Sequence, residues 1–220
     1  MRSIALDLET TGLNPKEGHK IIEIGCVELV NNFPSGKVWQ KYINPKRHMP
    51  EEAFKVHGLS EDFLSDKPLF SEVAQNFLEF IKDSTLIIHN SQFDLKFLNH
   101  ELEIINLNTI DLNKNKIVDT IDIARKLFPG QSVSLDALCK RYKISIERKK
   151  HGALLDAELL TEVYLEMQGG RQQYMDLVLD KHNKQVQRNT KKINYSKEIY
   201  KLTKEELENH EKLIEFINNY

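Results

Sequence analysis

Two acidic residues, Asp7 and Glu9, lie two positions apart at the end of an apolar, strand-like segment that begins at residue 3 (S-I-A-L-D-L-E). Because side chains alternate between the two faces of a strand, both carboxylates point to the same side. Two like charges this close raise the pKa of one of them unless a cation neutralises the pair. Carboxylate oxygens are the ligands that Mg²⁺ and Mn²⁺ prefer, so the pair indicates a divalent-metal site. A solvated strand end is the alternative.

A third acid, Asp94, follows a short apolar strand at residues 85–88 and stands at the start of a helix predicted over 93–102. Strand ends of a central sheet are where α/β proteins gather their ligands, which favours a place for Asp94 beside the first pair of acids. The alternative is a helix acid that satisfies free N–H groups in the first turn. We interpret the neighbouring His89 as structural, connecting one strand end to its neighbour.

A histidine and a fourth acid complete the set of reactive groups. His151 lies in a loop after the basic residues 148–150, and Asp156 lies five positions later in the first turns of a helix predicted over 153–167. An imidazole that titrates near neutral pH suits a general base. The alternatives are an exposed loop histidine and an acid that complements the helix dipole.

The elements that must position these residues follow an α/β pattern. Residues 3–8, 21–30 and 37–43 read as strands joined by short turns, which predicts an antiparallel meander. After them helices and strands alternate: helices are expected at 70–81, 93–102, 122–127, 134–142 and 153–167, and strands at 85–88 and 117–118. This order predicts a mixed central sheet, with additional strands beside the meander, flanked by helices.

The chain of 220 residues is long enough for one medium domain and an extension. We expect the domain over residues 1–168, where the periodic apolar pattern ends. Residues 169–201 begin with two glycines and are rich in Lys, Gln and Asn, which is typical of a flexible linker. Residues 202–220 regain a helical pattern, so the chain is predicted to end in a short helical tail.

The composition excludes several classes of protein. With 31 basic and 33 acidic residues the net charge is −2, so the chain does not bind nucleic acid through bulk positive charge. Cys26 and Cys139 lie too far apart for a disulfide framework or a thiolate zinc site, and we expect both to be buried apolar residues. No apolar run approaches the roughly 20 residues that span a bilayer, and no signal peptide is expected. We therefore expect a cytoplasmic protein.

Taken together, the order of these acids and the histidine resembles that of the DnaQ-like 3′→5′ exonucleases of the DEDDh class. Residues 7–12 (D-L-E-T-T-G), 89–94 (H-N-S-Q-F-D) and 151–156 (H-G-A-L-L-D) look like the three motifs of that family. The resemblance covers residues 1–168 and implies a ribonuclease H-like exonuclease fold.

The same resemblance implies a role for each reactive residue. Asp7, Glu9, Asp94 and Asp156 would hold two Mg²⁺ or Mn²⁺ ions, with Asp7 bridging both ions and Asp94 acting partly through water. His151 would remove a proton from the attacking water. Two such ions roughly 3.5–4 Å apart can activate the nucleophile and stabilise the leaving oxygen of a phosphodiester.

Substrate contacts are also implied by the resemblance. Thr10 would offer its backbone N–H to the terminal 3′-hydroxyl and Leu13 would wedge against the terminal bases, with His57 and Phe93 beside them. The metal-holding residues Asp7, Glu9 and Asp156 would contact the substrate as well. For Leu13 and Phe93 the alternative is ordinary core packing, and for His57 it is a hydrogen bond within a loop.

Within this family the chain is most similar to the proofreading (epsilon) subunits of bacterial DNA polymerase III. The similar segments are 18–25, 52–59, 134–139 and 163–167. This likeness implies hydrolysis of the terminal phosphodiester of DNA, with release of nucleoside monophosphates, as proofreading for the replicative polymerase. The alternatives are a stand-alone DEDDh nuclease that acts on RNA ends or short oligonucleotides, and a non-enzymatic scaffold that bridges two replication proteins.

The residues after the domain resemble partner-binding segments. Gln172, Met175 and Leu177 look like the peptide that binds the beta sliding clamp, although Leu stands where an aromatic residue is common. Residues 202–217 are similar to the epsilon tail that docks on the polymerase alpha subunit, and ordering on a partner suits a helix this short. A plain linker and a charge-mixed disordered tail are the alternatives.

Overall fold

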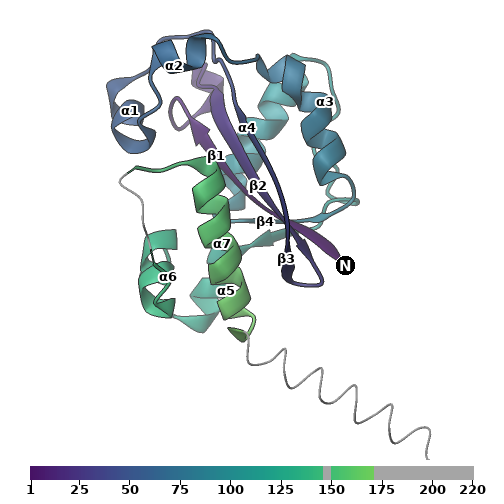
Figure 1. The fold of residues 1–220 in the computed structure, drawn as a ribbon, viewed down its shortest axis with the longest axis vertical. Coiled ribbons are helices and arrows are strands. Elements are labelled where there is room, and N and C mark those ends of the chain that lie inside the picture. The colour runs from purple at the N-terminus through teal and green to yellow at the C-terminus, as the bar shows by residue number, and fades with distance from the viewer. Residues whose placement is uncertain (146–149, 171–220) are drawn as a thin grey trace, which may run out of the picture. The chain divides into compact units, whose positions relative to one another are not determined.

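The computed structural model describes residues 1–145 and 150–170, and within them five strands form one open mixed sheet (Figure 1). The strands are β1 (Arg2–Thr10), β2 (Ile21–Val30), β3 (Phe33–Tyr42), β4 (Thr85–Ile88) and β5 (Ile117–Asp119), in the spatial order β3-β2-β1-β4-β5. The first three strands pair antiparallel, and β4 and β5 run parallel to β1. The predicted meander and mixed sheet are confirmed, with β1 at the centre.

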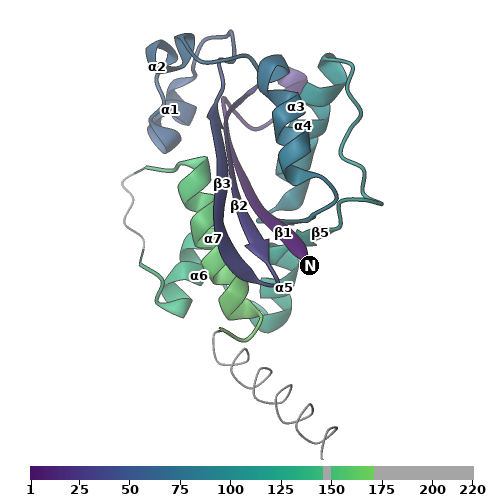
Figure 2. The same cartoon turned by 45° about the vertical axis from the view of Figure 1, so that its right-hand side comes forward.

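Helices cover both faces of this sheet (Figure 2). They are α1 (Glu51–His57), α2 (Glu61–Ser65), α3 (Phe70–Ile81), α4 (Ser91–Ile104), α5 (Thr120–Leu127), α6 (Leu135–Tyr142) and α7 (Ala153–Met167), besides a short 3₁₀ turn, η1 (Pro15–Glu17). Helices α3 and α4 pack on one face of the sheet, and α7 packs on the other with α5 and α6 against it. None of the helices in the described ranges has both the length and the apolar character needed to cross a membrane.

The central strand divides its side chains between the two layers. Ile4, Leu6 and Leu8 point into the core formed with α3 and α4, whereas Ala5 lies in the core formed with α7. Since side chains alternate along a strand, Asp7 and Glu9 share the face of Ala5. Both acids therefore point toward the layer that contains α7.

Several boundaries differ from those predicted from the sequence, most clearly the starts of β3 and α4. Strand β3 begins at Phe33 rather than Lys37, because Asn31 and Asn32 both adopt a left-handed conformation and make a tight hairpin turn. As an edge strand, β3 tolerates the proline at its second position. Helix α4 begins two residues earlier than expected, at Ser91.

Helices α1 and α2 were not expected from the sequence. They have seven and five residues, and most of their side chains are exposed, so neither produces a clear apolar period. The prediction for the two cysteines is confirmed, because Cys26 and Cys139 are both fully buried. Burial raises the pKa of the Cys26 thiol, and the charge of Asp7 adds to this effect.

The start of α7 lies directly on β2. A Cβ atom at Gly25 would come within 2.2 Å of the backbone carbon of Ala153, so only glycine allows the helix to approach this closely. Beside it, the buried carboxylate of Glu23 accepts a hydrogen bond from the backbone N–H of Ala153 at 3.1 Å. Gly25 and Glu23 thus set the position of α7 and, with it, of Asp156.

A methyl group at Gly25 is therefore expected to push α7 off the sheet. We expect Gly25→Ala to lower the free energy of unfolding by about 1–3 kcal/mol, the usual cost of overpacking a core. Urea denaturation followed by circular dichroism measures this change. Gly152→Ala is the matched control, because a Cβ there would meet its nearest neighbour at 3.9 Å. Equal stability of the two variants would contradict this account of the contact.

Candidate active site

His151 and Asp156 form the best-defined pair of the site. The imidazole Nδ1 lies 2.9 Å from Oδ2 of Asp156. The Asp156 side chain is only 5% exposed and the His151 side chain is 45% exposed, so a buried carboxylate orients a ring that solvent and substrate can reach. Asp156 stands in the first turn of α7, where its own N–H bonds to the carbonyl of Gly152.

Glu9 joins this pair from the central strand. A ligand atom from each of Glu9, His151 and Asp156 lies within 4.8 Å of the other two. Glu9 is buried near the end of β1, and the pairing of β1 with β2 shifts by one residue between Glu9 and Thr10. Such irregularities re-aim side chains at the ends of strands and are common next to active sites.

Asp94 reaches the same edge of the sheet from α4. It lies in the first turn of that helix and is only 3% exposed. Burial raises the pKa of Asp94 well above its ordinary value, and the charges of Asp119 and Glu9 raise it further. The side chain of Asp94 therefore lies within electrostatic reach of Glu9, across the end of β1.

Asp119 lies outside the family motifs and stabilises the start of α4. Its carboxylate accepts hydrogen bonds from the backbone N–H of Ser91 at 2.7 Å and from the Ser91 hydroxyl at 2.8 Å. It also accepts from the N–H of Ile121 and so caps α5. Burial opposes ionisation of Asp119, but these hydrogen bonds outweigh it and lower its pKa. Asp119 thus remains an anion that fixes the turn carrying Asp94.

Asp7 completes the group of acids. It is half-buried, pairs with Gly25 in the register of β1 and β2, and shares the α7 side of the sheet with Glu9. The structure thus brings Glu9 and Asp156 together beside His151, places Asp94 within electrostatic reach of Glu9, and leaves Asp7 on the same face of β1 two residues before Glu9. A set made of carboxylate oxygens, one of them with a raised pKa, fits a hard divalent cation such as Mg²⁺ or Mn²⁺.

The four predicted substrate contacts other than the acids lie in different environments. Leu13 is 81% exposed, so the core-packing alternative for it is wrong. Phe93 does pack against the core, with its ring centroid 5.0 Å from that of Phe97. Thr10 is buried, and its hydroxyl donates to the carbonyl of Gly12 at 2.7 Å.

His57 lies at the end of α1 and not in a loop. It is 5% exposed, and its Nδ1 accepts a hydrogen bond from the N–H of Leu59 at 3.0 Å, while its buried Nε2 has no hydrogen-bond partner. Burial lowers the pKa of His57 to about 4, with a further contribution from the charge of Lys150. His57 is thus neutral at physiological pH, with its proton on Nε2.

Sequence reasoning missed Glu23 and Asp119, which position the start of α7 and of α4. A signal existed for each: Glu23 is a charged residue inside an apolar strand, and Asp119 is the acid that ends the short strand β5. The interpretation of His89 is confirmed, since its Nδ1 lies 2.9 Å from the hydroxyl of Thr120 and so connects the ends of β4 and β5. The predicted clamp contacts, Gln172, Met175 and Leu177, lie outside the described residues.

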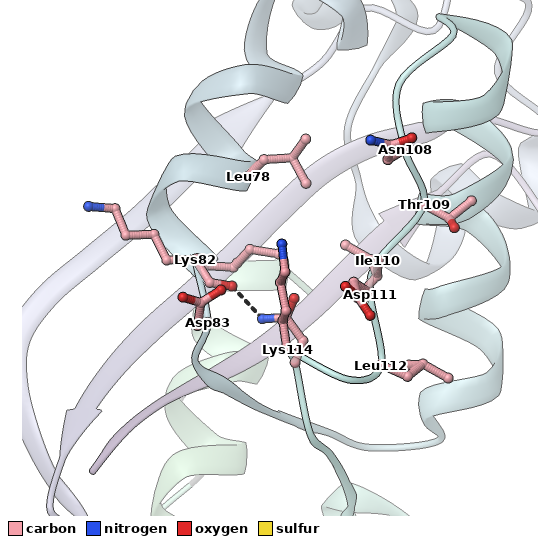
Figure 3. A pocket seen from close by; sticks show the side chains of 11 residues that line it. Leu78, Lys82, Asp83, Asn108, Thr109, Ile110, Asp111, Leu112 and Lys114 are labelled. Atoms are coloured by element: carbon pink, nitrogen blue, oxygen red, sulfur yellow. Dashed lines mark hydrogen bonds between the residues drawn. The ribbon is translucent and has the colours of Figure 1, made fainter.

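A separate pocket lies at the opposite end of the parallel strands. It is lined by Lys82 and Asp83 after α3 and by Asp111 and Lys114 on the loop before β5 (Figure 3). These residues precede β4 and β5, whereas Glu9 lies near the end of β1 and Asp94 follows β4. The pocket is therefore not part of the candidate site.

Comparisons with known proteins show to which family the chain belongs. Residues 4–164 match the family described as Exonuclease (RNase_T). The chain is 51% identical to "DNA polymerase III subunit epsilon" of Rickettsia typhi, over 99% of this chain and 97% of that protein. It is 48% identical to the Escherichia coli protein of the same name, over 77% of this chain and 72% of that protein.

Solved structures support the fold. The nuclease domain of 3′hExo, described as a DEDDh family member, superimposes with a TM-score of 0.67 at 18% identity, over 76% of this chain and 92% of that one. E. coli Exonuclease I gives a TM-score of 0.68 at 15% identity, over 81% of this chain and 43% of that one. The family match and the high identity, in contrast, establish kinship: the chain belongs to the Exonuclease (RNase_T) family, among the DNA polymerase III epsilon subunits.

Proposed function

We propose that this chain is a metal-dependent 3′→5′ exonuclease that proofreads for DNA polymerase III. It would hydrolyse the terminal phosphodiester of DNA and release nucleoside monophosphates. The observation that carries the proposal is the cluster of Glu9, His151 and Asp156, with atoms within 4.8 Å of one another, at the sheet edge that also holds Asp94. The names of the relatives support the same activity.

The acids Asp7, Glu9, Asp94 and Asp156 are the residues that would hold the cations. When bound, two divalent cations supply charge neutralisation at the phosphoryl group and at the leaving 3′-oxygen. Asp94 and Asp156 are buried in the first turns of α4 and α7, which restricts the directions that their carboxylates can take. The two helix N-termini add partial positive charge beside them.

His151 is the proposed general base. An ionised Asp156 can only accept a hydrogen bond, so the proton of the neutral imidazole lies on Nδ1 and the lone pair of Nε2 stays available. The base takes a proton from the attacking water at Nε2, and the buried carboxylate then stabilises the imidazolium ion that forms. The exposure of the ring allows substrate to approach it.

The neighbouring residues would hold the 3′ end. Because Nδ1 of His57 accepts from Leu59, its Nε2–H is a neutral donor without a partner, and binding of the 3′ end would have to expose this buried atom for it to donate to a substrate oxygen. Leu13 offers an exposed apolar side chain against which terminal bases can pack, and Thr10 and Phe93 lie beside the acids in the chain. Asp7, Glu9 and Asp156 would reach the same nucleotide through the cations.

Residues after the domain are proposed to bind partners. The segment 202–220 would dock on the alpha subunit of the polymerase, and Gln172, Met175 and Leu177 would bind the beta sliding clamp. With a net charge of −2, the free chain is expected to bind DNA weakly, so its partners would supply most of the effective concentration at the primer end. Such a complex works in the cytoplasm.

A comparison of substrates tests the proposed activity. The full-length chain with Mg²⁺ is incubated with a DNA primer carrying a 3′ mismatch, a fully paired primer and an RNA of the same sequence. We expect loss of a 3′-terminal label first, release of nucleoside monophosphates, and faster release from DNA than from RNA. Preference for RNA would favour the stand-alone nuclease instead, and no hydrolysis at all would favour a scaffold.

Removal of the base is expected to separate chemistry from metal binding. His151→Ala should lower kcat roughly 10²–10⁴-fold, the usual contribution of a positioned acid or base, and leave the Mg²⁺ concentration for half-maximal activity unchanged. Asp7→Ala should lower kcat and also raise the Mg²⁺ concentration needed for half-maximal activity. His48→Ala is the control, because that ring is 86% exposed and pairs with Glu61 on the surface. Wild-type turnover of His151→Ala would rule out the general-base role.

The lowered pKa of His57 makes stability depend on pH. The ordinary pKa is 6.5 and the folded value is about 4, so the folded protein resists protonation. The contribution of neutral His57 is complete above pH 6.5 and is lost as the pH falls toward 4. We expect His57→Asn to lose less stability than wild type between pH 7 and 4.5 in urea denaturation. Identical pH dependence in the two proteins would show that His57 is not the buried titrating group.

A further inference from the structure

The segment that leads into α7 is attached to the end of α1. The backbone N–H of His151 donates to the carbonyl of Val56 at 3.1 Å. The preceding residue, Lys150, places its ammonium 4.5 Å from the ring centroid of Phe54 and 3.5 Å from the carbonyl oxygen of the same residue. Residues almost one hundred positions apart are thereby joined, and α1 lies beside the start of α7 in both views (Figures 1 and 2).

The end of α1 has the right shape and charge for this lysine. The last carbonyls of a helix carry partial negative charge, which attracts a cation. Gly58 closes the helix in a left-handed conformation with φ of 75°. A Cβ atom there would lie 2.3 Å from Cδ of Lys150, so the lysine stem occupies the space above the glycine. Lys150 thus packs against Gly58 and the Phe54 ring, and its ammonium lies near the carbonyl oxygen of Phe54.

These contacts hold the backbone of His151, whereas Asp156 contacts its ring. The 2.9 Å hydrogen bond to Asp156 orients the ring, whereas the bond to Val56 fixes the backbone from which the ring projects. Proton transfer needs the acceptor nitrogen within hydrogen-bond reach of the water, and small displacements lower the rate. The attachment to α1 therefore bears directly on catalysis.

We propose that Lys150 and Phe54 are positioning residues that hold the backbone of His151 against α1 and so keep the general base in place. The inference rests on the proposed role of His151. Neither residue needs to touch the substrate. A direct contact between the Lys150 ammonium and a substrate phosphate is the competing explanation, and kinetics distinguish the two.

The test uses the full-length chain and a 3′-mismatched DNA primer, with kcat and KM measured separately. Lys150→Ala and Phe54→Leu should each lower kcat about two- to fivefold, the range that an exposed cation–π contact supports, and leave KM unchanged. The double variant should be no slower than the slower single variant, because both changes break one contact. Lys150→Arg should restore the wild-type rate, since arginine keeps the charge and packs on an aromatic ring.

Two controls make the outcome specific. Lys55→Ala removes a charge from the same helix, where Lys55 pairs with Glu51, and should leave kcat unchanged. In a His151→Ala background, Lys150→Ala and Phe54→Leu should not lower the residual rate further.

The outcomes separate this inference from the function on which it rests. A raised KM for Lys150→Ala, or a further loss in the His151→Ala background, would overturn the inference in favour of direct substrate contact. Unchanged kcat in Lys150→Ala and Phe54→Leu, with His151→Ala inactive, would overturn the inference alone. Wild-type activity of His151→Ala would overturn the general-base role as well.

Discussion

Burial of carboxylates at one edge of the sheet, together with the repulsion between them, is the constraint that the rest of the structure must satisfy. Asp94 shows it most clearly, because burial and the charges of Asp119 and Glu9 together raise its pKa. Isolated buried charges are costly and persist only when they are paired, protonated or bound to a metal. The site is therefore stable in one of two ways, with a proton among the acids or with cations between them, and only the second state suits hydrolysis.

The fold holds this unfavourable arrangement with contacts that lie outside the motifs. Glu23 and Gly25 on β2 fix the position of the start of α7, and Asp119 at the end of β5 fixes the position of the start of α4. In each case a carboxylate accepts from backbone N–H groups that a helix start leaves without partners. The acids proposed to hold the cations are thus supported by two other acids, Glu23 and Asp119, whose carboxylate oxygens all accept hydrogen bonds.

Much of this architecture could be predicted from local patterns. The alternation in β1 placed Asp7 and Glu9 on one face, the apolar run at β4 indicated a buried strand, and the spacing from His151 to Asp156 fitted a loop followed by a helix. What local patterns could not show were contacts between distant residues. The bond from Ala153 to Glu23 joins positions 130 apart; a charge inside an apolar strand marks Glu23 as unusual, but no local pattern names Ala153 as its partner. Helices as short as α1 depend on tertiary contacts, so the place of His57 in one was missed.

The most direct test of the central claim is the thermal unfolding midpoint of the chain in EDTA and in Mg²⁺, compared between wild type and Asp94→Asn. If repulsion among buried acids is the governing constraint, Mg²⁺ raises the midpoint of the wild type. Asp94→Asn then unfolds at a higher temperature than the wild type in EDTA, because the buried carboxyl that must either carry a charge or take up a proton is gone, and gains less from Mg²⁺. The account would be contradicted if Mg²⁺ left the wild-type midpoint unchanged and Asp94→Asn unfolded at a lower temperature than the wild type in EDTA.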